Sequence, residues 1–215
     1  MAYSALPSKS DTDTLDLTTY NKIKGNFEAG CPDIMTAKGD LVAATAANAA
    51  APVAVGDDDS TLVADASQTA GLAWQIVPAV HLTLSGAELM DQEVWTSIEF
   101  DTETGDTDSM HEGVTNPERI TIPTGGSGWF LIGFNANASR AAANDSSWQA
   151  RVLLNGTTEI AHAMSRSDRP AYINLSIGYP LTAADYIEVQ YYSGAVADQS
   201  IAAGASFWAI WQRRQ

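Results

Sequence analysis

The sequence predicts an all-β sandwich in the C-terminal part of the chain, preceded by an extended N-terminal segment. After residue 80, apolar and polar residues alternate in short runs, a pattern typical of half-buried strands. Turn residues separate these runs at spacings of about a dozen residues, as in sandwiches and barrels. Residues 34–77 differ from the rest, because they are rich in Ala, Gly and Asp and contain few large side chains.

The expected strands follow from these runs. Residues 129–137 are long and apolar enough for a central buried strand, and Asn155-Gly156 predicts a tight hairpin between residues 148–155 and 157–164. A strand at 94–100 would place Val94, Thr96, Ile98 and Phe100 on one side. Further strands are expected at residues 81–84, 119–122, 171–178, 186–192 and 206–212, and no helix is expected after residue 80.

The N-terminal part predicts one short helix over residues 16–25, with Leu17, Tyr20 and Ile23 on one side. A helix this short is marginal alone and needs a surface to dock against. Residues 34–77 contain short apolar triplets between Gly and Asp turns, and they bury too little area to offset their ordering entropy. We expect winding with identical copies, or contact with another protein, to order this segment; a flexible linker is the alternative.

Composition excludes several classes of protein. The formal net charge is −15, so we expect no nucleic-acid partner, because binding one requires clustered Lys and Arg. No apolar run approaches the roughly 20 residues of a membrane-spanning helix, and no signal peptide is expected. The single cysteine, Cys31, leaves no internal disulfide. All four lysines precede residue 40, which suggests that the two ends of the chain have different surroundings.

An ordered set of short motifs carries a family resemblance. These motifs are the Asp106–His111 loop after Phe100, Asn116-Pro117 with Arg119, Gly128-Trp129-Phe130, Arg151–Thr157, Leu181–Val189 and Phe207-Trp208. In this order they resemble the C1q/TNF-like jelly-roll domains found at the ends of phage fibres and spikes. The resemblance implies two facing sheets, a trimer around an apolar axis, and binding rather than catalysis. The collagen Gly-x-y repeat that precedes the domain in animal proteins is missing.

Residues 36–74 resemble the attachment and shaft segments that precede terminal domains in phage minor tail proteins, fibres and head appendages. The resemblance implies a virion-attachment and shaft segment at residues 1–78 and a jelly-roll head at residues 79–215. The expected function is that of a non-enzymatic phage virion structural protein, a trimeric surface appendage that stabilises the particle or adheres. It would be a capsid decoration, head fibre or minor tail protein on the virion surface, assembled in the host cytoplasm.

Two alternatives stay open for the function. One is a tail-tip receptor-binding protein that recognises a host-surface glycan, and the other is a free C1q-like carbohydrate-binding module. The expected partners are two further copies of the chain and other virion proteins, contacted through the N-terminal segment, with a host-surface glycan as an additional candidate.

Candidate site residues come from strands and loops. Strand aromatics exceed what one core is expected to hold, so Tyr191, Phe207 and Trp211 are candidates for a trimer interface, with ordinary core packing as the alternative. The acidic loop offers Asp106, Asp108 and Glu112 as weak Ca²⁺ ligands. Its spacing is not that of an EF-hand, however, so we favour a loop pinned by side-chain hydrogen bonds, with His111 bonded to a neighbouring strand. No metal and no cofactor are expected.

Two loops are candidates for ligand contact, through Arg140 and Asn144 in one and Arg166 and Arg169 in the other. The alternative is that both are solvated hairpin ends. Residues 125–128, Gly-Gly-Ser-Gly, match neither the nucleophile-elbow spacing nor a P-loop. No catalytic residues are therefore assigned.

Overall fold

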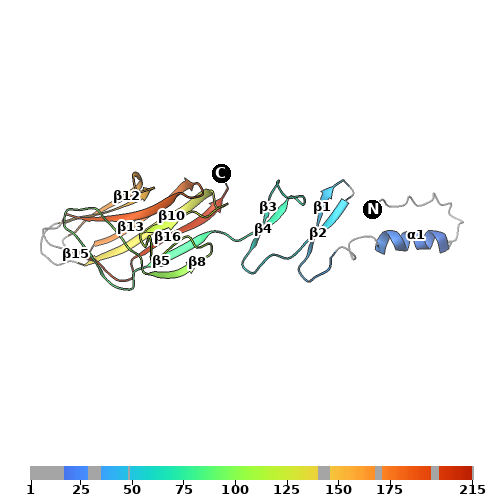
Figure 1. Ribbon diagram of the computed structural model, residues 1–215, viewed down its shortest axis with the longest axis horizontal. Coiled ribbons are helices and arrows are strands. Elements are labelled where there is room, and N and C mark those ends of the chain that lie inside the picture. Colours follow the sequence, from blue (N-terminus) through green and yellow to red (C-terminus); the bar gives the residue numbers. More distant parts are fainter. Residues whose placement is uncertain are drawn as a thin grey trace. The chain divides into compact units, whose positions relative to one another are not determined.

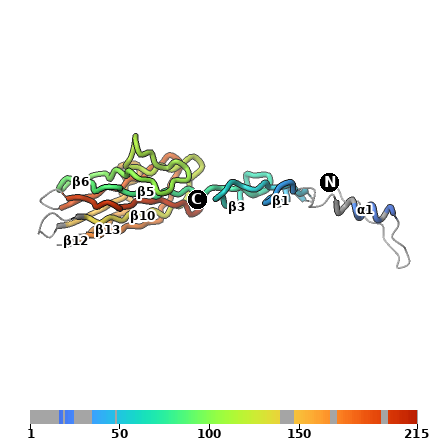
Figure 2. The backbone as a smooth tube through the Cα atoms, turned by 90° about the horizontal axis from the view of Figure 1, so that it is seen from below, coloured from blue at the N-terminus to red at the C-terminus, as the bar shows by residue number. Residues whose placement is uncertain are grey.

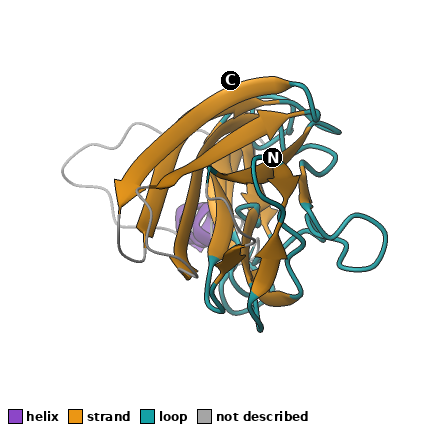
Figure 3. Ribbon diagram, turned by 90° about the vertical axis from the view of Figure 1, so that its left-hand side faces the viewer, coloured by secondary structure: helices purple, strands orange, loops and turns teal. Residues whose placement is uncertain are grey.

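The computed structural model describes residues 17–28, 35–47, 49–139, 146–167, 171–194 and 199–214. The chain divides into two compact units, residues 1–76 and residues 77–215. Within the described ranges, strands dominate and the single helix belongs to the first unit (Figure 3). No helix in these ranges is long and apolar enough to cross a bilayer.

The first unit contains a helix and two hairpins. Helix α1 (Leu17–Glu28) confirms the helix expected at residues 16–25, and its Leu17, Tyr20 and Ile23 side chains are exposed. The hairpins pair antiparallel strands β1 (Leu41–Ala46) with β2 (Ala49–Val53), and β3 (Thr61–Ala64) with β4 (Leu72–Gln75).

In the described part of the first unit, backbone pairing and side-chain hydrogen bonds hold the hairpins, with little apolar packing. Asp40 Oδ2 accepts hydrogen bonds from the backbone N–H groups of Thr36 and Ala37 at 3.0 and 2.9 Å. Trp74 Nε1 donates to the Ala54 carbonyl at 2.7 Å, which links the second hairpin to the end of the first. Among the described residues of this unit, Ala43 is the only buried hydrophobic residue. Two-stranded hairpins are marginal without a further surface, so these two hairpins have little stability of their own.

The second unit is a sandwich of two sheets (Figure 1). In the seven-stranded sheet, β10 is central, with β13 on one edge and β16 and β15 on the other; β5 pairs with β16, β6 with β15, and β8 with β5. Figure 2 shows β5, β10 and β13 running together in this sheet. The strands are β5 (Ala79–Thr83), β6 (Glu88–Met90), β8 (Thr102–Asp106), β10 (Gly128–Ser139), β13 (Ala171–Leu181), β15 (Gln199–Ile201) and β16 (Ser206–Arg213).

The five-stranded sheet has the order β12–β11–β14, and both β7 and β9 pair with the outer edge of β14. Its strands are β7 (Thr96–Ser97), β9 (Arg119–Thr121), β11 (Ser146–Leu154), β12 (Thr158–Ser167) and β14 (Tyr186–Ser193). Asn155 and Gly156 both have positive φ, 50° and 71°, as the tight hairpin between β11 and β12 requires.

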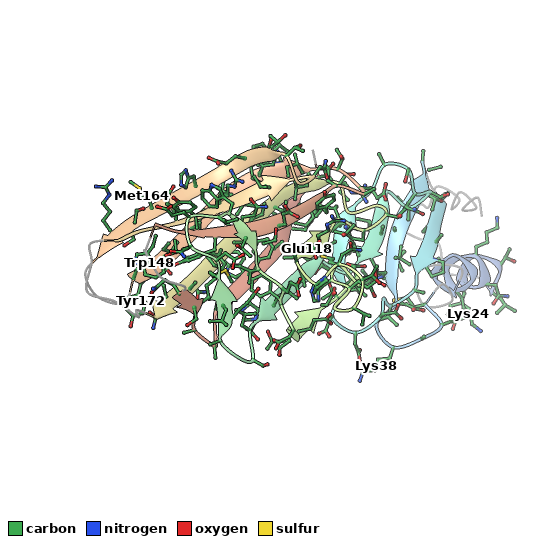
Figure 4. All side chains as sticks on the ribbon, turned by 60° about the vertical axis from the view of Figure 1, so that its left-hand side comes forward. Lys24, Lys38, Glu118, Trp148, Met164 and Tyr172 are labelled. Carbon is green, nitrogen blue, oxygen red and sulfur yellow. The ribbon has the colours of Figure 1, made fainter. Side chains whose placement is uncertain are left out.

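The core lies between the two sheets and follows the strand alternation. Phe130, Ile132 and Phe134 of β10 point inward and are buried. The Phe100 and Phe207 rings stack with centroids 5.7 Å apart. Figure 4 labels Trp148, which is buried, as well as Met164 and Tyr172, which are among the most exposed large side chains.

The strands expected from the sequence match β5, β9 to β14 and β16, with ends that differ by a few residues. The strand expected at residues 94–100 is shorter, because only Thr96 and Ser97 pair with β14. Ile98 and Phe100 are nevertheless buried, whereas Val94 is exposed. In the second unit, strands β6, β8 and β15 were not expected, and the sequence predicts part of the acidic loop where β8 lies.

Candidate functional site

The outward face of the seven-stranded sheet carries an apolar row across three strands. Leu131 on β10 lies opposite Ile210 on β16, and Ile210 lies opposite Ala79 on β5. The next row places Gly133, Trp208 and His81 side by side. We call Ala79, Leu131, Trp208 and Ile210 the apolar face. Leu131 and Ile210 each remain 39% exposed in the single chain, so this face is an unpartnered hydrophobic surface.

The Trp208 indole lies directly over Gly133. A methyl group at Gly133 would come within 2.1 Å of Trp208 Cζ2, so only glycine lets the ring lie flat on the sheet. Beside the ring, a shallow pocket of about 390 Å³ is lined by the apolar face together with Val80, His81, Gly105 and Thr107. Its lining is mainly apolar, so it suits apolar groups, such as side chains of another protein surface, better than a polar molecule.

The structure corrects two of the three expected interface residues. Tyr191 and Phe207 have no exposed surface and belong to the core of the single chain, so neither is available to another copy. Burial also raises the pKa of the Tyr191 hydroxyl. Trp211 packs against the same core with partial exposure, and its N–H groups donate to the Pro78 and Ser127 carbonyls. The two residues of β16 that the sequence suggested for the interface, Phe207 and Trp211, lie on the inward side of the strand. Trp208 and Ile210, on its outward side, were not among the candidates.

The acidic loop is pinned by side-chain hydrogen bonds, as expected. Asp106 accepts from the backbone N–H groups of Asp108, Met110 and His111 at 3.2, 2.9 and 2.9 Å. The His111 ring is buried, with Nδ1 2.7 Å from Glu103 Oε1 on β8 and Nε2 3.1 Å from the Pro117 carbonyl. Asp106 and His111 therefore hold the loop against strand β8.

The three weak Ca²⁺ candidates, Asp106, Asp108 and Glu112, each make hydrogen bonds to different partners. Asp106 oxygens accept the backbone hydrogen bonds just described, an Asp108 oxygen lies 3.4 Å from the Thr107 hydroxyl, and Glu112 accepts from the Thr115 hydroxyl at 3.1 Å. Within the described parts of the chain, no group of three His, Cys, Asp or Glu side chains is arranged to hold a metal ion.

Most of the expected ligand-loop residues lie outside the described ranges. This applies to Arg140, Asn144 and Arg169. Arg166 is described: it lies in β12, opposite Ser147 of β11, and it is exposed. Its place is thus on the outer surface of the five-stranded sheet.

A second acidic group surrounds Glu88 on β6. Glu88 Oε1 accepts from the Glu99 N–H at 3.4 Å, and Glu88 Oε2 is buried with no hydrogen-bond partner among the described residues. The pKa of Glu88 is raised to about 7, chiefly by burial and in smaller part by the nearby carboxylates of Glu99 and Asp101, while the hydrogen bond from the Glu99 N–H lowers it. Asp101 behaves in the opposite way, since hydrogen bonds from Ser85 hold its pKa below the usual value.

Comparisons with known proteins support the fold. No family model matches the sequence, and no curated protein matches it. The solved structure of Eiger TNF from S. frugiperda aligns with a TM-score of 0.50 at 11% identity, over 65% of this chain and 94% of that one. This likeness shows the fold alone, and it confirms the expected C1q/TNF-like jelly roll.

Two further solved structures align with lower scores. The globular domain of zebrafish complement 1qA protein has a TM-score of 0.47 at 11% identity, over 64% of this chain and 99% of that one. Murine APRIL has a TM-score of 0.47 at 10% identity, over 63% of this chain and 99% of that one.

Proposed function

We propose that this jelly-roll protein is a non-enzymatic phage virion structural protein, a homotrimeric appendage on the virion surface. Residues 1–78 attach it to other virion proteins, and residues 79–215 form a head that stabilises the particle or adheres. The resemblance of residues 36–74 to phage attachment segments supports the virion role. The paucity of buried hydrophobic side chains among the described residues of the first unit supports an anchor that needs a partner.

The apolar face is the single observation that carries the trimer. The core of the second unit is complete without this face, because the inward residues of β10 and β16 already fill the space between the sheets. Leu131, Trp208 and Ile210 are therefore surplus to the single chain. Burial of such a surface against other copies is favourable by about 25 cal/mol per Å² of apolar area. The number three comes from the family resemblance, which implies assembly around an apolar axis.

Light scattering on the purified full-length protein tests the assembly. We expect the wild type to have three times the mass of the chain, and Leu131→Asp to give a monomer, because it places a charge in the apolar row. Leu89→Asp is the matched control, since Leu89 is 78% exposed on β6 and lies outside the apolar face. Circular dichroism checks that each variant is folded. A monomeric wild type, or a Leu131→Asp protein that stays trimeric, would contradict the proposal.

Electron cryomicroscopy of the phage particle tests the virion role and shows where on the particle the protein lies. Threefold knobs on the capsid lattice would identify a decoration or head fibre, whereas density at the tail tip would identify a host-contact protein. Particles assembled with protein that lacks residues 1–76, which leaves the whole second unit in place, should carry no such density. Normal incorporation of the shortened protein would show that the anchor lies elsewhere.

A further inference from the structure

The outward face of the five-stranded sheet carries a continuous row of polar side chains. Arg151 on β11 lies opposite His162 on β12 and Gln190 on β14, and Gln190 lies opposite Ser97 on β7. Arg151 Nε and Nη2 donate to Gln190 Oε1 at 3.0 and 2.6 Å, and Gln190 Nε2 donates to Ser97 Oγ at 3.2 Å. The row therefore spans four strands, or about 14 Å at ordinary strand spacing.

Trp95 lies over this row and is held from three strands. The Arg151 guanidinium carbon is 4.2 Å from the centre of the indole. The Tyr192 ring lies 5.4 Å away at 42°, and the His162 ring lies 5.9 Å away at 72°. Contacts of this kind fix the indole in place before any ligand arrives, which lowers the entropy lost on binding.

Polar groups that donate and accept hydrogen bonds surround the ring. Glu159 lies 3.7 Å from Arg151 Nη1 and 3.5 Å from His162 Nδ1, and Gln149 Oε1 lies 3.1 Å from His162 Nε2. We call this set the Trp95 strip: Trp95, Gln149, Arg151, Glu159, His162, Gln190 and Tyr192. Exposed Met164 and Arg166 continue along β12 on the same side.

Core packing does not account for the Trp95 strip. Trp95 does not belong to the hydrophobic core cluster, and the indole is partly exposed on the opposite side of the sheet from that core. The same sheet has another Arg–aromatic pair, Arg119 over Tyr186 at 4.1 Å, but the described residues give that ring no aromatic neighbour. Three rings, a guanidinium, a carboxylate and two amides therefore converge on a surface that the core does not require.

We propose that the Trp95 strip binds a neutral saccharide. A pyranose ring presents a C–H face that packs on an aromatic ring, and adjacent hydroxyls that donate and accept hydrogen bonds. The carboxylate of Glu159 accepts, the guanidinium of Arg151 donates, and the amides of Gln149 and Gln190 do both. An anionic sugar is disfavoured, because Glu159 neutralises Arg151 and the whole chain carries a net charge of −15. The inference does not rest on the trimer or on virion attachment.

Saturation-transfer NMR on the full-length protein tests the inference. The probes are the methyl glycosides of glucose, galactose, mannose and N-acetylglucosamine, with sialyllactose as the charged comparison. We expect saturation transfer to at least one neutral glycoside. The Trp95→Leu variant should bind that glycoside at least about tenfold more weakly, because it loses one stacked aromatic contact and the area buried there. Trp95→Phe, which keeps a ring, should retain part of the affinity.

Tyr186→Leu is the matched control, because it removes the other aromatic ring that an arginine covers on the same sheet. It should bind like the wild type, and so should the Leu131→Asp protein in either assembly state. If Trp95→Leu fails to fold, Gln149→Ala replaces it and should also weaken binding. No transfer to any neutral glycoside, transfer to sialyllactose alone, or binding unchanged by these strip substitutions would overturn the inference.

Discussion

At the scale of single residues, Glu88 is the group that ties protonation to stability. Its pKa is raised from 4.5 to about 7 in the folded protein, chiefly by burial. Between these two values the folded chain binds more protons at Glu88 than the unfolded chain does. The contribution of Glu88 to stability is therefore greatest below pH 4.5 and is lost as pH rises through 7.

Glu88→Gln should remove this pH dependence. We expect the variant to be more stable than the wild type at pH 8, with an advantage that shrinks at pH 5, because glutamine stays neutral throughout. Urea unfolding followed by tryptophan fluorescence measures the stability of the variant and the wild type at each pH. Fluorescence reports on the second unit, since five of the six tryptophans lie in residues 77–215. Glu112→Gln, which removes an exposed carboxylate from the acidic loop, is measured beside it as a surface control. Parallel profiles for wild type and Glu88→Gln would show that Glu88 titrates normally.

The same scale shows what alternation in a sequence can and cannot specify. Alternation along residues 206–212 correctly separates Phe207 from Trp208, but it does not say which of the two sets faces the core. Both sets contain large apolar side chains, so hydrophobicity does not decide the matter, and the sequence prediction chose the inward set for the interface. The pairing partners decide it, because Phe207 stacks on Phe100, more than 100 positions away in the chain.

At the scale of elements, the fit of β10 against β16 depends on Gly133. Gly133→Ala should destabilise the protein by about 1–3 kcal/mol, the usual effect of overpacking, because the new methyl group displaces the Trp208 indole. Gly178→Ala is the matched control: Gly178 lies on the neighbouring strand β13, opposite Leu131, and a methyl group there meets open space. Urea unfolding should separate the two variants, and equal stabilities would show that Trp208 relocates freely.

Elements differ in how well the sequence predicts them. Strand β10 has 12 residues, and the hairpin between β11 and β12 has an Asn-Gly turn, so local pattern and turn chemistry are sufficient for both. Strands β6 and β15 have three residues each; β6 pairs with β15 and β15 pairs with the end of β10, and no local pattern reveals either pairing. The acidic loop was predictable because its bonds join near neighbours, whereas the Trp95 strip joins Trp95 and β14 to the β11–β12 hairpin across long stretches of the chain.

At the scale of the whole molecule, the two units should differ in their ability to fold alone. Every residue of the main core cluster lies between Val80 and Ala209, and none comes from the first unit. Hydrogen bonds to two backbone carbonyls mark the start of the second unit. The Val77 carbonyl accepts from the Thr107 hydroxyl at 3.1 Å, and the Pro78 carbonyl accepts from the Trp211 backbone N–H at 2.9 Å. A head that begins at Val77 keeps both contacts.

Residues 77–215 alone should therefore fold and unfold in one cooperative transition. In light scattering, this piece should have three times the mass of its single chain, as expected for the full-length protein. A shorter piece, residues 81–215, should be less stable, because it lacks these two carbonyls and the part of β5 that pairs with Ala209 and Ile210. Thermal unfolding of both pieces beside the full chain measures the difference. If residues 77–215 were monomeric while the full chain was trimeric, the N-terminal unit would be the main source of assembly, and the apolar face would need another partner.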